Sequence, residues 1–333
     1  MFVDRTGSRS PSVRLGENSY VSVFLTRRCA LRCQYCGQDG GERNWDDFSF
    51  SAFCRVLSEA RQIGFSCVSI TGGDPLCYPQ FEKVLKAVEE SGLWLFLETN
   101  GRLVSERVAQ RLGDFARRLT CRVSLTLDSV SPERHDRFRG KGAHAAALAA
   151  LARLRSHEVV VQVCKTLLPD EVSETWRLQP FLDWCRTLGV ARVDVGRVVP
   201  MGRGQAEWYR LSSEQIQEVR RQLMACSGYG TFVCSDDFLL AREASPCRRI
   251  AGESQGVFVT NNAIAPCSFL PELVLGVPAD LVPVVSELST SSVHVSRETA
   301  LASVDPESVW GCPECRLALV RGRNGLGAAG LGR

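Results

Sequence analysis

From residue 20 to residue 198, apolar positions follow two alternating periods. Short apolar runs bounded by turn residues predict strands, and longer segments with apolar residues every three or four positions predict helices. The expected strands are residues 20–26, 67–71, 93–98, 121–127, 159–166 and 191–198. The expected helices are residues 51–63, 80–90, 105–112, 143–155 and 175–188. Regular alternation of strand and helix indicates an α/β fold.

Strands this apolar are typical of a parallel sheet covered by helices. The sheet could stay open or curl into a partial barrel, and the pattern alone favours neither. In both architectures ligands bind at the carboxyl ends of the strands. Two segments that could carry chemistry follow strands directly, and we therefore expect them at that edge: residues 29–36 and residues 72–75.

After residue 200 the pattern changes. A Gly-rich link leads to an expected helix at residues 213–224 and a short strand at residues 231–234. Residues 257–260 and 263–265 flank an Asn-Asn pair and predict a hairpin. The expected division is an N-terminal extension (1–17), a core (18–205), a smaller C-terminal domain (206–320) and a flexible Gly/Ala-rich tail (321–333).

Composition narrows the class of protein. The chain has 333 residues, of which 44% are hydrophobic, and a formal net charge of +3 from 40 basic and 37 acidic residues. This balance gives no reason to expect nucleic acid or a membrane surface as partner. There is no signal peptide and no run of the roughly 18 apolar residues that a membrane helix needs. We expect a cytoplasmic protein, in which 15 cysteines indicate metal binding or catalysis rather than disulfides.

Three of these cysteines stand close together after the first strand. Cys29, Cys33 and Cys36 form a C-x3-C-x2-C run. Thiolates are the usual ligands of iron–sulfur clusters, and three of them can hold three irons of a [4Fe–4S] cube. The fourth iron would be open for chemistry, as in catalytic metal sites. A zinc loop is the alternative, although zinc prefers four protein ligands and no fourth is evident nearby.

With Tyr35 before its last cysteine, this run resembles the signature of the radical S-adenosylmethionine (SAM) superfamily. The resemblance implies a partial (β/α)6 TIM-like barrel whose open iron binds the methionine part of SAM. It also implies reductive cleavage of SAM to a 5′-deoxyadenosyl radical that abstracts a substrate hydrogen. The electron would come from a ferredoxin or flavodoxin.

Other segments agree with the resemblance. Gly72, Gly73, Asp74 and Pro75 resemble the superfamily's GGEP motif, with Asp in place of Glu, whose backbone takes the SAM amino group. Taken alone, this sequence is a turn. Residues 98–101 resemble the segment that ends the third strand, although an ordinary turn explains them equally well.

The fourth strand and the segment after it resemble a Ser-Leu-Asp…His-Asp-x-x-Arg stretch of the branch with auxiliary clusters. By this resemblance Thr126 contacts the ribose and Arg139 the carboxylate of SAM, for which a guanidinium fork is suited. The alternative is a solvated charged loop. For His135 we expect a structural role rather than a general base, and Lys165 is a candidate acid or base at a strand end.

Four cysteines form a second group in the C-terminal part: Cys247, Cys267, Cys312 and Cys315. Their spacing resembles the twitch domain, a shortened relative of the SPASM domain. The resemblance implies a second, auxiliary [4Fe–4S] cluster with four protein ligands, suited to electron transfer or support. A four-cysteine zinc site is the alternative.

Among the other cysteines, Cys234 precedes an acidic pair, Asp236 and Asp237. In radical epimerases of this architecture one cysteine donates a hydrogen atom to the substrate radical, and Cys234 is our candidate. Core packing, or a further place in the cluster domain, is the alternative. We interpret the remaining cysteines as small apolar residues: Cys54, Cys67, Cys77, Cys121, Cys164, Cys185 and Cys226.

Three functions remain open. The first is maturation of a peptide natural product by epimerisation, cross-linking or oxidation. The second is epimerisation or dehydrogenation of an aminosugar or aminocyclitol. The third is a non-catalytic iron–sulfur or zinc protein. Only about twenty residues precede the first strand, which we interpret as too few for the leader-binding domain that peptide maturases often carry, although a separate protein could supply it.

Overall fold

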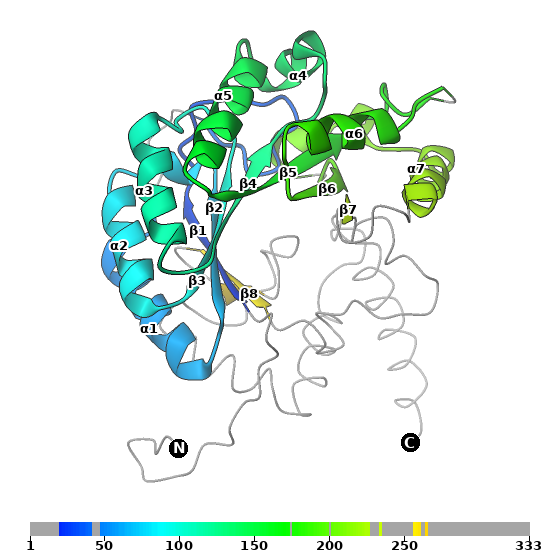
Figure 1. Cartoon of the computed structure of the whole chain (residues 1–333). Helices are drawn as coiled ribbons and strands as arrows, with labels where there is room; N and C mark the ends of the chain where they lie inside the picture. Colours follow the sequence, from blue (N-terminus) through cyan, green and yellow to red (C-terminus); the bar gives the residue numbers. More distant parts are fainter. Residues whose placement is uncertain are drawn as a thin grey trace, which may run out of the picture.

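In the computed structural model, a curved sheet is covered on its outer side by helices (Figure 1). The structure describes residues 20–41, 47–173, 175–199 and 201–226, together with strands at 233–234, 256–259 and 264–265 and the adjoining Thr260. Within this part of the chain the sheet has nine strands in the order β7-β6-β5-β4-β3-β2-β1-β8-β9. Neighbouring strands are parallel except for the last pair. The predicted α/β class is confirmed.

Six strands in chain order form the centre of the sheet, as the sequence predicts. They are β1 (Tyr20–Thr26), β2 (Cys67–Gly72), β3 (Trp94–Thr99), β4 (Cys121–Thr126), β5 (Val160–Leu167) and β6 (Arg192–Arg197). The helices are α1 (Phe50–Ile63), α2 (Phe81–Ser91), α3 (Glu106–Ala116), α4 (Pro132–Arg139), α5 (Ala143–Ser156), α6 (Gln179–Thr187) and α7 (Ser213–Ala225). Each strand feeds a helix that returns over the outer face, which is the arrangement of a parallel β/α sheet.

One segment differs from the expectation. The charged stretch after the fourth strand, which was not among the expected helices, forms helix α4. The hydroxyl of Ser131 accepts a hydrogen bond from the backbone N–H of Arg134, and Pro132 occupies the first turn, where its missing N–H costs nothing. These start signals were present in the sequence, but the low hydrophobicity of the segment hid the helix.

The sheet continues past the boundary expected near residue 205. Strand β7 (Val233–Cys234) pairs with β6, and strand β8 (Gly256–Val259) pairs with β1, both in parallel. Strand β9 (Ile264–Ala265) returns antiparallel to β8, which confirms the predicted hairpin. Val259 is fully buried in the same apolar cluster as the barrel strands. Segments from the C-terminal part therefore extend both edges of the core sheet.

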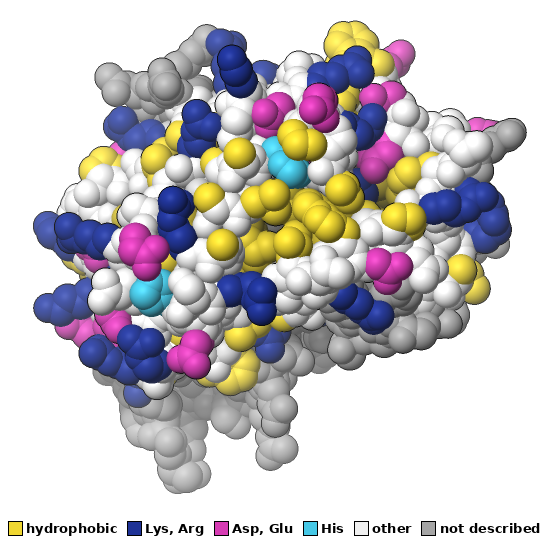
Figure 2. Space-filling view, turned by 45° about the horizontal axis from the view of Figure 1, so that its top comes forward, with side chains coloured by type: hydrophobic (Ala, Val, Ile, Leu, Met, Phe, Trp, Pro, Cys, Tyr) yellow, Lys and Arg dark blue, Asp and Glu magenta, His cyan; other side chains and the backbone are white. Residues whose placement is uncertain are grey.

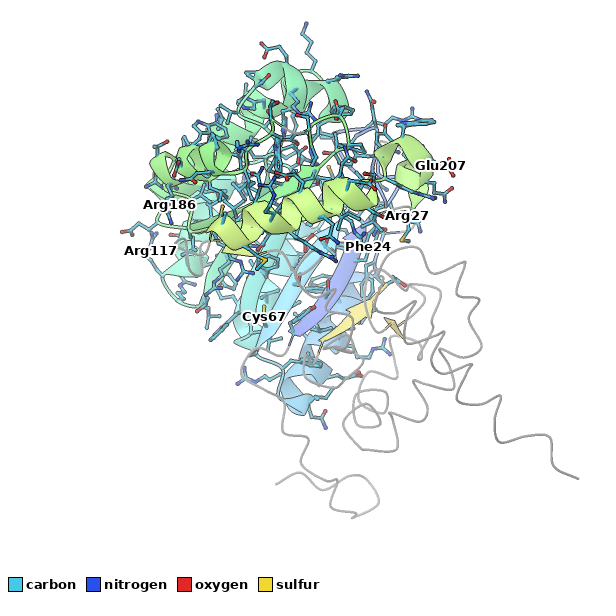
Figure 3. All side chains as sticks on the ribbon, turned by 90° about the vertical axis from the view of Figure 1, so that its right-hand side faces the viewer. Phe24, Arg27, Cys67, Arg117, Arg186 and Glu207 are labelled. Atoms are coloured by element: carbon cyan, nitrogen blue, oxygen red, sulfur yellow. The ribbon has the colours of Figure 1, made fainter. Side chains whose placement is uncertain are left out.

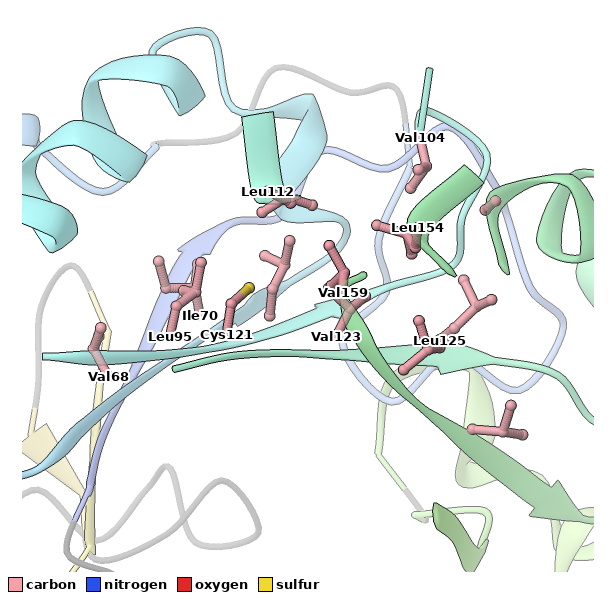
Figure 4. Packing of buried hydrophobic residues seen from close by; sticks show 14 of the residues in the cluster. Val68, Ile70, Leu95, Val104, Leu112, Cys121, Val123, Leu125, Leu154 and Val159 are labelled. Atoms are coloured by element: carbon pink, nitrogen blue, oxygen red, sulfur yellow. The ribbon is translucent and has the colours of Figure 1, made fainter. Parts of the chain in front are cut away.

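Strand residues alternate between the helix layer and the barrel interior. Leu95 of β3 is 1% exposed and belongs to the same buried apolar cluster as Leu112 of α3 and Leu125 of β4 (Figure 4). The intervening positions face inward and include polar residues, such as Glu98 of β3 and Thr166 of β5, which line an interior cavity. The apolar core therefore lies between sheet and helices, and the interior is left for polar chemistry.

The surface carries both signs of charge. On the face shown in Figure 2, basic and acidic side chains are interspersed around a band of apolar ones. No described helix is both long and apolar enough to cross a membrane. In Figure 3, Cys67 marks the amino end of β2, and Arg27 lies at the opposite edge of the sheet, where β1 ends and the site begins.

Candidate functional site

A cavity of about 280 Å³ opens at the carboxyl ends of the strands. All three cysteines of the loop after β1 line it, together with Tyr35. Its other walls are formed by Leu31, Gly37, Gln38, Thr71, Gly72, Gly73, Glu98, Thr99, Asn100, Thr126, Arg139, Thr166, Arg197, Val198, Val199 and Met201. The fold thus brings the cysteine run, the Gly-Gly turn and the ends of strands β2–β6 to one place, as the sequence predicts.

Each thiol of the loop faces an N–H group. The backbone N–H of Leu31 and the Asn100 amide point at the Cys29 sulfur, both at 3.4 Å, and the N–H of Gly40 points at the Cys36 sulfur at 3.4 Å. Burial raises the pKa of the Cys29 thiol to about 12, so a bound cation is needed for it to ionise at neutral pH.

The Gly-Gly turn touches the backbone of the loop. The N–H of Gly73 donates to the Thr26 carbonyl at 2.6 Å, and the N–H of Asp74 donates to the Arg28 carbonyl at 2.8 Å. A Cβ on Gly73 would lie 2.5 Å from the carbonyl oxygens of Arg27 and Arg28. Only glycine allows the two backbones to approach this closely.

Two residues of the GGDP motif lie outside the cavity. The Asp74 side chain is fully buried, and its oxygens accept hydrogen bonds from the backbone of Leu76 and from Thr99 and Asn100. Pro75 begins the short 3-10 helix η1 (Pro75–Cys77) and is also buried. Asp74 therefore braces the end of β3 against the turn, and of the four motif residues Gly72 and Gly73 line the cavity. The cofactor-binding role expected for Asp74 and Pro75 stays a prediction.

Asp128 is the centre of a buried network that the sequence did not single out. Its carboxylate accepts hydrogen bonds from the Tyr35 hydroxyl at 2.5 Å and from two nitrogens of Arg139 at 2.5 and 3.1 Å. The backbone N–H of Thr166 adds a further donor at 3.0 Å. Burial acts to raise the pKa of Asp128, but the Arg139 charge and the hydrogen bonds outweigh it and lower the pKa to about 2.

Arg139 reaches the cavity only in part. Its fork is engaged by Asp128 through Nε and Nη2, and the expected contact with the SAM carboxylate stays a prediction. Its remaining nitrogen, Nη1, lies 3.9 Å from the Cys33 sulfur, and Nη2, which also binds Asp128, lies 3.4 Å from the Thr166 hydroxyl. Its guanidinium also lies over the Tyr35 ring, 5.1 Å from the centroid. Thr126 lines the same wall.

Two candidate acid–base residues have structural positions. His135 is 2% exposed, and its Nδ1 accepts the backbone N–H of Asp128 at 3.1 Å. Lys165 is 1% exposed and binds Glu171 at 2.6 Å and the carbonyl of Asp128. Neither lines the cavity. The structural role expected for His135 agrees with this geometry, and the substrate-facing role considered for Lys165 does not.

The lining of the cavity includes one acidic and one further basic side chain, Glu98 and Arg197. Glu98 is exposed to the cavity and accepts a hydrogen bond from Thr71 at 2.9 Å. Desolvation inside the barrel raises the pKa of Glu98, and the negative charge of Asp194 also raises it. Arg197, at the end of β6, lines the same cavity. A ligand in this cavity therefore meets both a carboxylate and a guanidinium.

The second cysteine group lies outside the described residues: Cys247, Cys267, Cys312 and Cys315. So do Asp236 and Asp237. Cys234 is described only as part of strand β7, where its backbone pairs with Asp194 of β6. Of the cysteines read as apolar, Cys121, Cys185 and Cys226 are buried and Cys54, Cys67, Cys77 and Cys164 are half-buried.

The donor set around the cavity fits an iron–sulfur cluster with one open iron. Three thiols from one loop line a shared cavity, and N–H groups point at their sulfurs, as is common around clusters. Across the described residues, no three Cys, His, Asp or Glu side chains converge on a single metal position. Cys29, Cys33 and Cys36 are the residues that would hold the cluster.

Comparisons with known sequences agree with this geometry. Residues 23–177 match the radical SAM superfamily. An AdoMet-dependent heme synthase of Methanosarcina barkeri is 28% identical over 194 residues, 55% of this chain and 52% of the relative. The subtilosin biosynthesis protein AlbA of Bacillus subtilis is 26% identical over 209 residues, 60% of this chain and 46% of the relative. The chain thus spans about half the length of these curated relatives.

A solved structure shows the same fold. SuiB of Streptococcus suis, in a crystal structure bound to S-adenosylmethionine, superposes with a TM-score of 0.65 at 14% identity, over 83% of this chain and 67% of SuiB. The parallel six-stranded core with alternating helices is therefore the partial TIM barrel expected from the sequence. Residues 23–177, which contain the three cysteines and the Gly-Gly turn, are thus a radical SAM domain.

Proposed function

We propose that the chain reductively cleaves SAM and uses the resulting 5′-deoxyadenosyl radical to abstract a hydrogen atom from a peptide during natural-product maturation. One electron from a ferredoxin or flavodoxin would break the sulfur–carbon bond and release methionine. The observation that carries this proposal is the single cavity lined by Cys29, Cys33 and Cys36 on one side and by Gly72 and Gly73 on the other.

The residues around the cavity would each have a definite task. The three thiols would hold the [4Fe–4S] cluster, and the carbonyls of the Gly-Gly turn would accept the SAM amino group. Thr126 would contact the ribose. Arg139, with its fork held by Asp128, would present its remaining N–H edge to the carboxylate. Tyr35 would keep that network in place through its hydrogen bond to Asp128.

Relatives support a peptide substrate. AlbA is named for the biosynthesis of the bacteriocin subtilosin, and SuiB has also been crystallised with its precursor peptide SuiA. The heme synthase relative is named for a product that is not a peptide, which keeps the aminosugar or aminocyclitol reaction as the second candidate. Transfer of deuterium from a labelled precursor peptide into 5′-deoxyadenosine would support the peptide, and transfer only from a labelled aminosugar would contradict it.

The first test is whether SAM is cleaved at all. Anaerobically reconstituted protein, reduced with dithionite, is expected to form 5′-deoxyadenosine, and the Cys29→Ala/Cys33→Ala/Cys36→Ala variant is expected to form none. Iron and sulfide are measured on the same samples. Well-loaded wild-type protein that gives no 5′-deoxyadenosine, or that holds zinc instead of iron, would instead favour a non-catalytic binding protein.

The cysteines of the C-terminal part would bind an auxiliary cluster. With two [4Fe–4S] clusters the protein holds about eight irons. Replacing Cys247, Cys267, Cys312 and Cys315 by Ala is expected to lower this to about four. An unchanged iron content in the four-cysteine variant would assign these residues another role.

Cys234 would decide the outcome of the reaction. If it donates a hydrogen atom to the substrate radical, Cys234→Ala retains 5′-deoxyadenosine formation but loses net epimerisation. The readout is the incorporation of solvent deuterium at the product stereocentre. A variant that epimerises at the wild-type rate would exclude Cys234 as the donor and favour the dehydrogenase or cross-linking reactions.

A further inference from the structure

We propose that Arg203 is a positioning residue that holds the cysteine loop in its ligand-binding shape. The proposal rests on the proposed function, because it assigns a role in forming the cluster site. Arg203 lies in the short 3-10 helix η2 (Gly202–Gln205), which follows strand β6. This segment is outside residues 23–177, the part of the chain that matches the superfamily.

The Arg203 guanidinium spans the loop between its second cysteine and its end. Its Nε donates to the carbonyl of Cys33 at 2.8 Å, and its Nη2 donates to the carbonyl of Gly40 at 2.8 Å. Its Nη1 binds the carboxylate of Asp39. The planar fork of arginine therefore satisfies three acceptors at fixed relative positions, which a lysine ammonium on a flexible stem would not reproduce.

The backbone beside Arg203 contacts the same loop. The N–H of Arg203 donates to the carbonyl of Cys36 at 3.0 Å. Gly202 has φ +51°, and a Cβ there would lie 2.7 Å from the carbonyl oxygens of Cys36 and Gly37. The segment after β6 is thus packed against the loop as closely as a glycine permits, and carbonyls of two cysteines, Cys33 and Cys36, are held by one residue.

Other hydrogen bonds hold the two residues between these cysteines, since the N–H of Gln34 donates to the Phe138 carbonyl at 2.8 Å and the Tyr35 hydroxyl donates to Asp128 at 2.5 Å. Within the loop, however, the N–H of Cys36 reaches the Cys33 carbonyl only at 3.3 Å, which is longer than the 2.8 Å bond from Arg203 to the same carbonyl. The side chain of Arg203 is 20% exposed, so its hydrogen bonds are partly shielded from water and stronger for it. Without them the Cys33 carbonyl would lose its shorter hydrogen bond, and the second cysteine of the loop would be held less firmly.

The experiment compares Arg203→Gln and Arg203→Lys with wild type and with Arg111→Gln. Arg111 is a matched control because it is similarly buried, at 23% exposure, and binds Glu89 at 2.8 Å in the helix layer. Iron per chain is measured after anaerobic reconstitution and desalting. The electron paramagnetic resonance spectrum of the reduced protein is recorded with and without SAM, and the melting temperature of the iron-free protein is measured.

We expect Arg203→Gln to lower bound iron at least twofold and to alter or abolish the spectral change caused by SAM. Arg203→Lys should recover only part of both, and Arg111→Gln should match wild type. The iron-free melting temperatures of the Arg203 and Arg111 variants should be similar, because the clamp acts on the loop rather than on the whole fold.

Four results would overturn the proposal. They are an Arg203→Gln spectrum and iron content equal to wild type, full recovery by lysine, loss of iron in Arg111→Gln as well, or a loss of iron that merely follows a lower iron-free melting temperature. If the wild-type protein itself binds no iron or shows no spectral response to SAM, the proposed function fails and the role assigned to Arg203 falls with it.

Discussion

At the scale of single residues, the site is organised by side chains that never reach the cavity. The carboxylate of Asp128 accepts hydrogen bonds from Tyr35 and Arg139, and His135 accepts one from the backbone N–H of Asp128. Removing one partner of such a buried network leaves an unsatisfied charge or donor, which is costly in a region that excludes water. The orientation of the cavity wall near Cys33 therefore depends on residues one contact away.

His135 should make stability depend on pH. Burial lowers its pKa from 6.5 to about 4, so between these values the unfolded chain binds a proton that the folded chain does not. Stability should therefore fall on acidification from pH 6.5 to pH 4, by on the order of 3 kcal/mol from this residue. The measurement is the free energy of unfolding across this range for wild type and His135→Asn.

The asparagine oxygen can still accept the Asp128 N–H, so the variant should fold but show a shallower pH dependence. His157→Asn is the control, because His157 lies in a more exposed pair with Glu106. Equal slopes for wild type and His135→Asn would show that folding does not lower the pKa of His135. Asp128 adds a pH dependence only below about pH 4, because the stabilisation from its lowered pKa is fully present above that pH and is lost as the pH falls through the folded-state value of about 2.

At the scale of elements, the site depends on turns whose backbones lie in close contact with neighbouring segments. The turn after β2 donates two backbone hydrogen bonds to the end of β1, and Gly101 after β3 has φ +83° with Leu125 and Ala150 close to where a Cβ would lie. Glycine is required at such points because any side chain would displace a neighbouring backbone or core residue.

Gly73→Ala should disturb the cysteine loop. Its Cβ would lie 2.5 Å from two carbonyl oxygens of the loop, which is too close for any rigid arrangement, so we expect destabilisation of about 1–3 kcal/mol and weaker iron binding. Gly41→Ala is the control, since nothing lies within 4 Å of a Cβ there. Thermal unfolding and iron content measure both effects. A Gly73→Ala protein as stable as Gly41→Ala would show that the turn has room to move.

At the scale of the whole molecule, the core sheet is completed by strands far along the chain. Strand β8 covers the edge of β1, the strand that leads into the cysteine loop, and β7 covers the edge of β6. An uncovered edge presents unpaired backbone groups. The described part of the C-terminal region thus supports the strand that positions the site, whatever further role its cysteines have.

Val259 tests this dependence. It is 0% exposed and belongs to the core cluster of the barrel, so Val259→Ala should lower the free energy of unfolding by about 2 kcal/mol. Val160→Ala, at a strand position that is 46% exposed, should change it by less than about 0.5 kcal/mol. Chemical denaturation measures both. Equal values for the two variants would mean that β8 contributes little to the core.

The sequence by itself determined what is local. The spacing of Cys29, Cys33 and Cys36, the strand before them and the periodicity of the β/α units depend on neighbouring residues, and they predicted the fold and the place of the site. Only the tertiary structure decided which distant groups meet: Asp128 with Arg139 and Tyr35, Asp74 with the end of β3, Arg203 with the loop, and β8 with β1. Such contacts depend on how strands and turns are stacked in space, and a motif specifies residue types without specifying their partners.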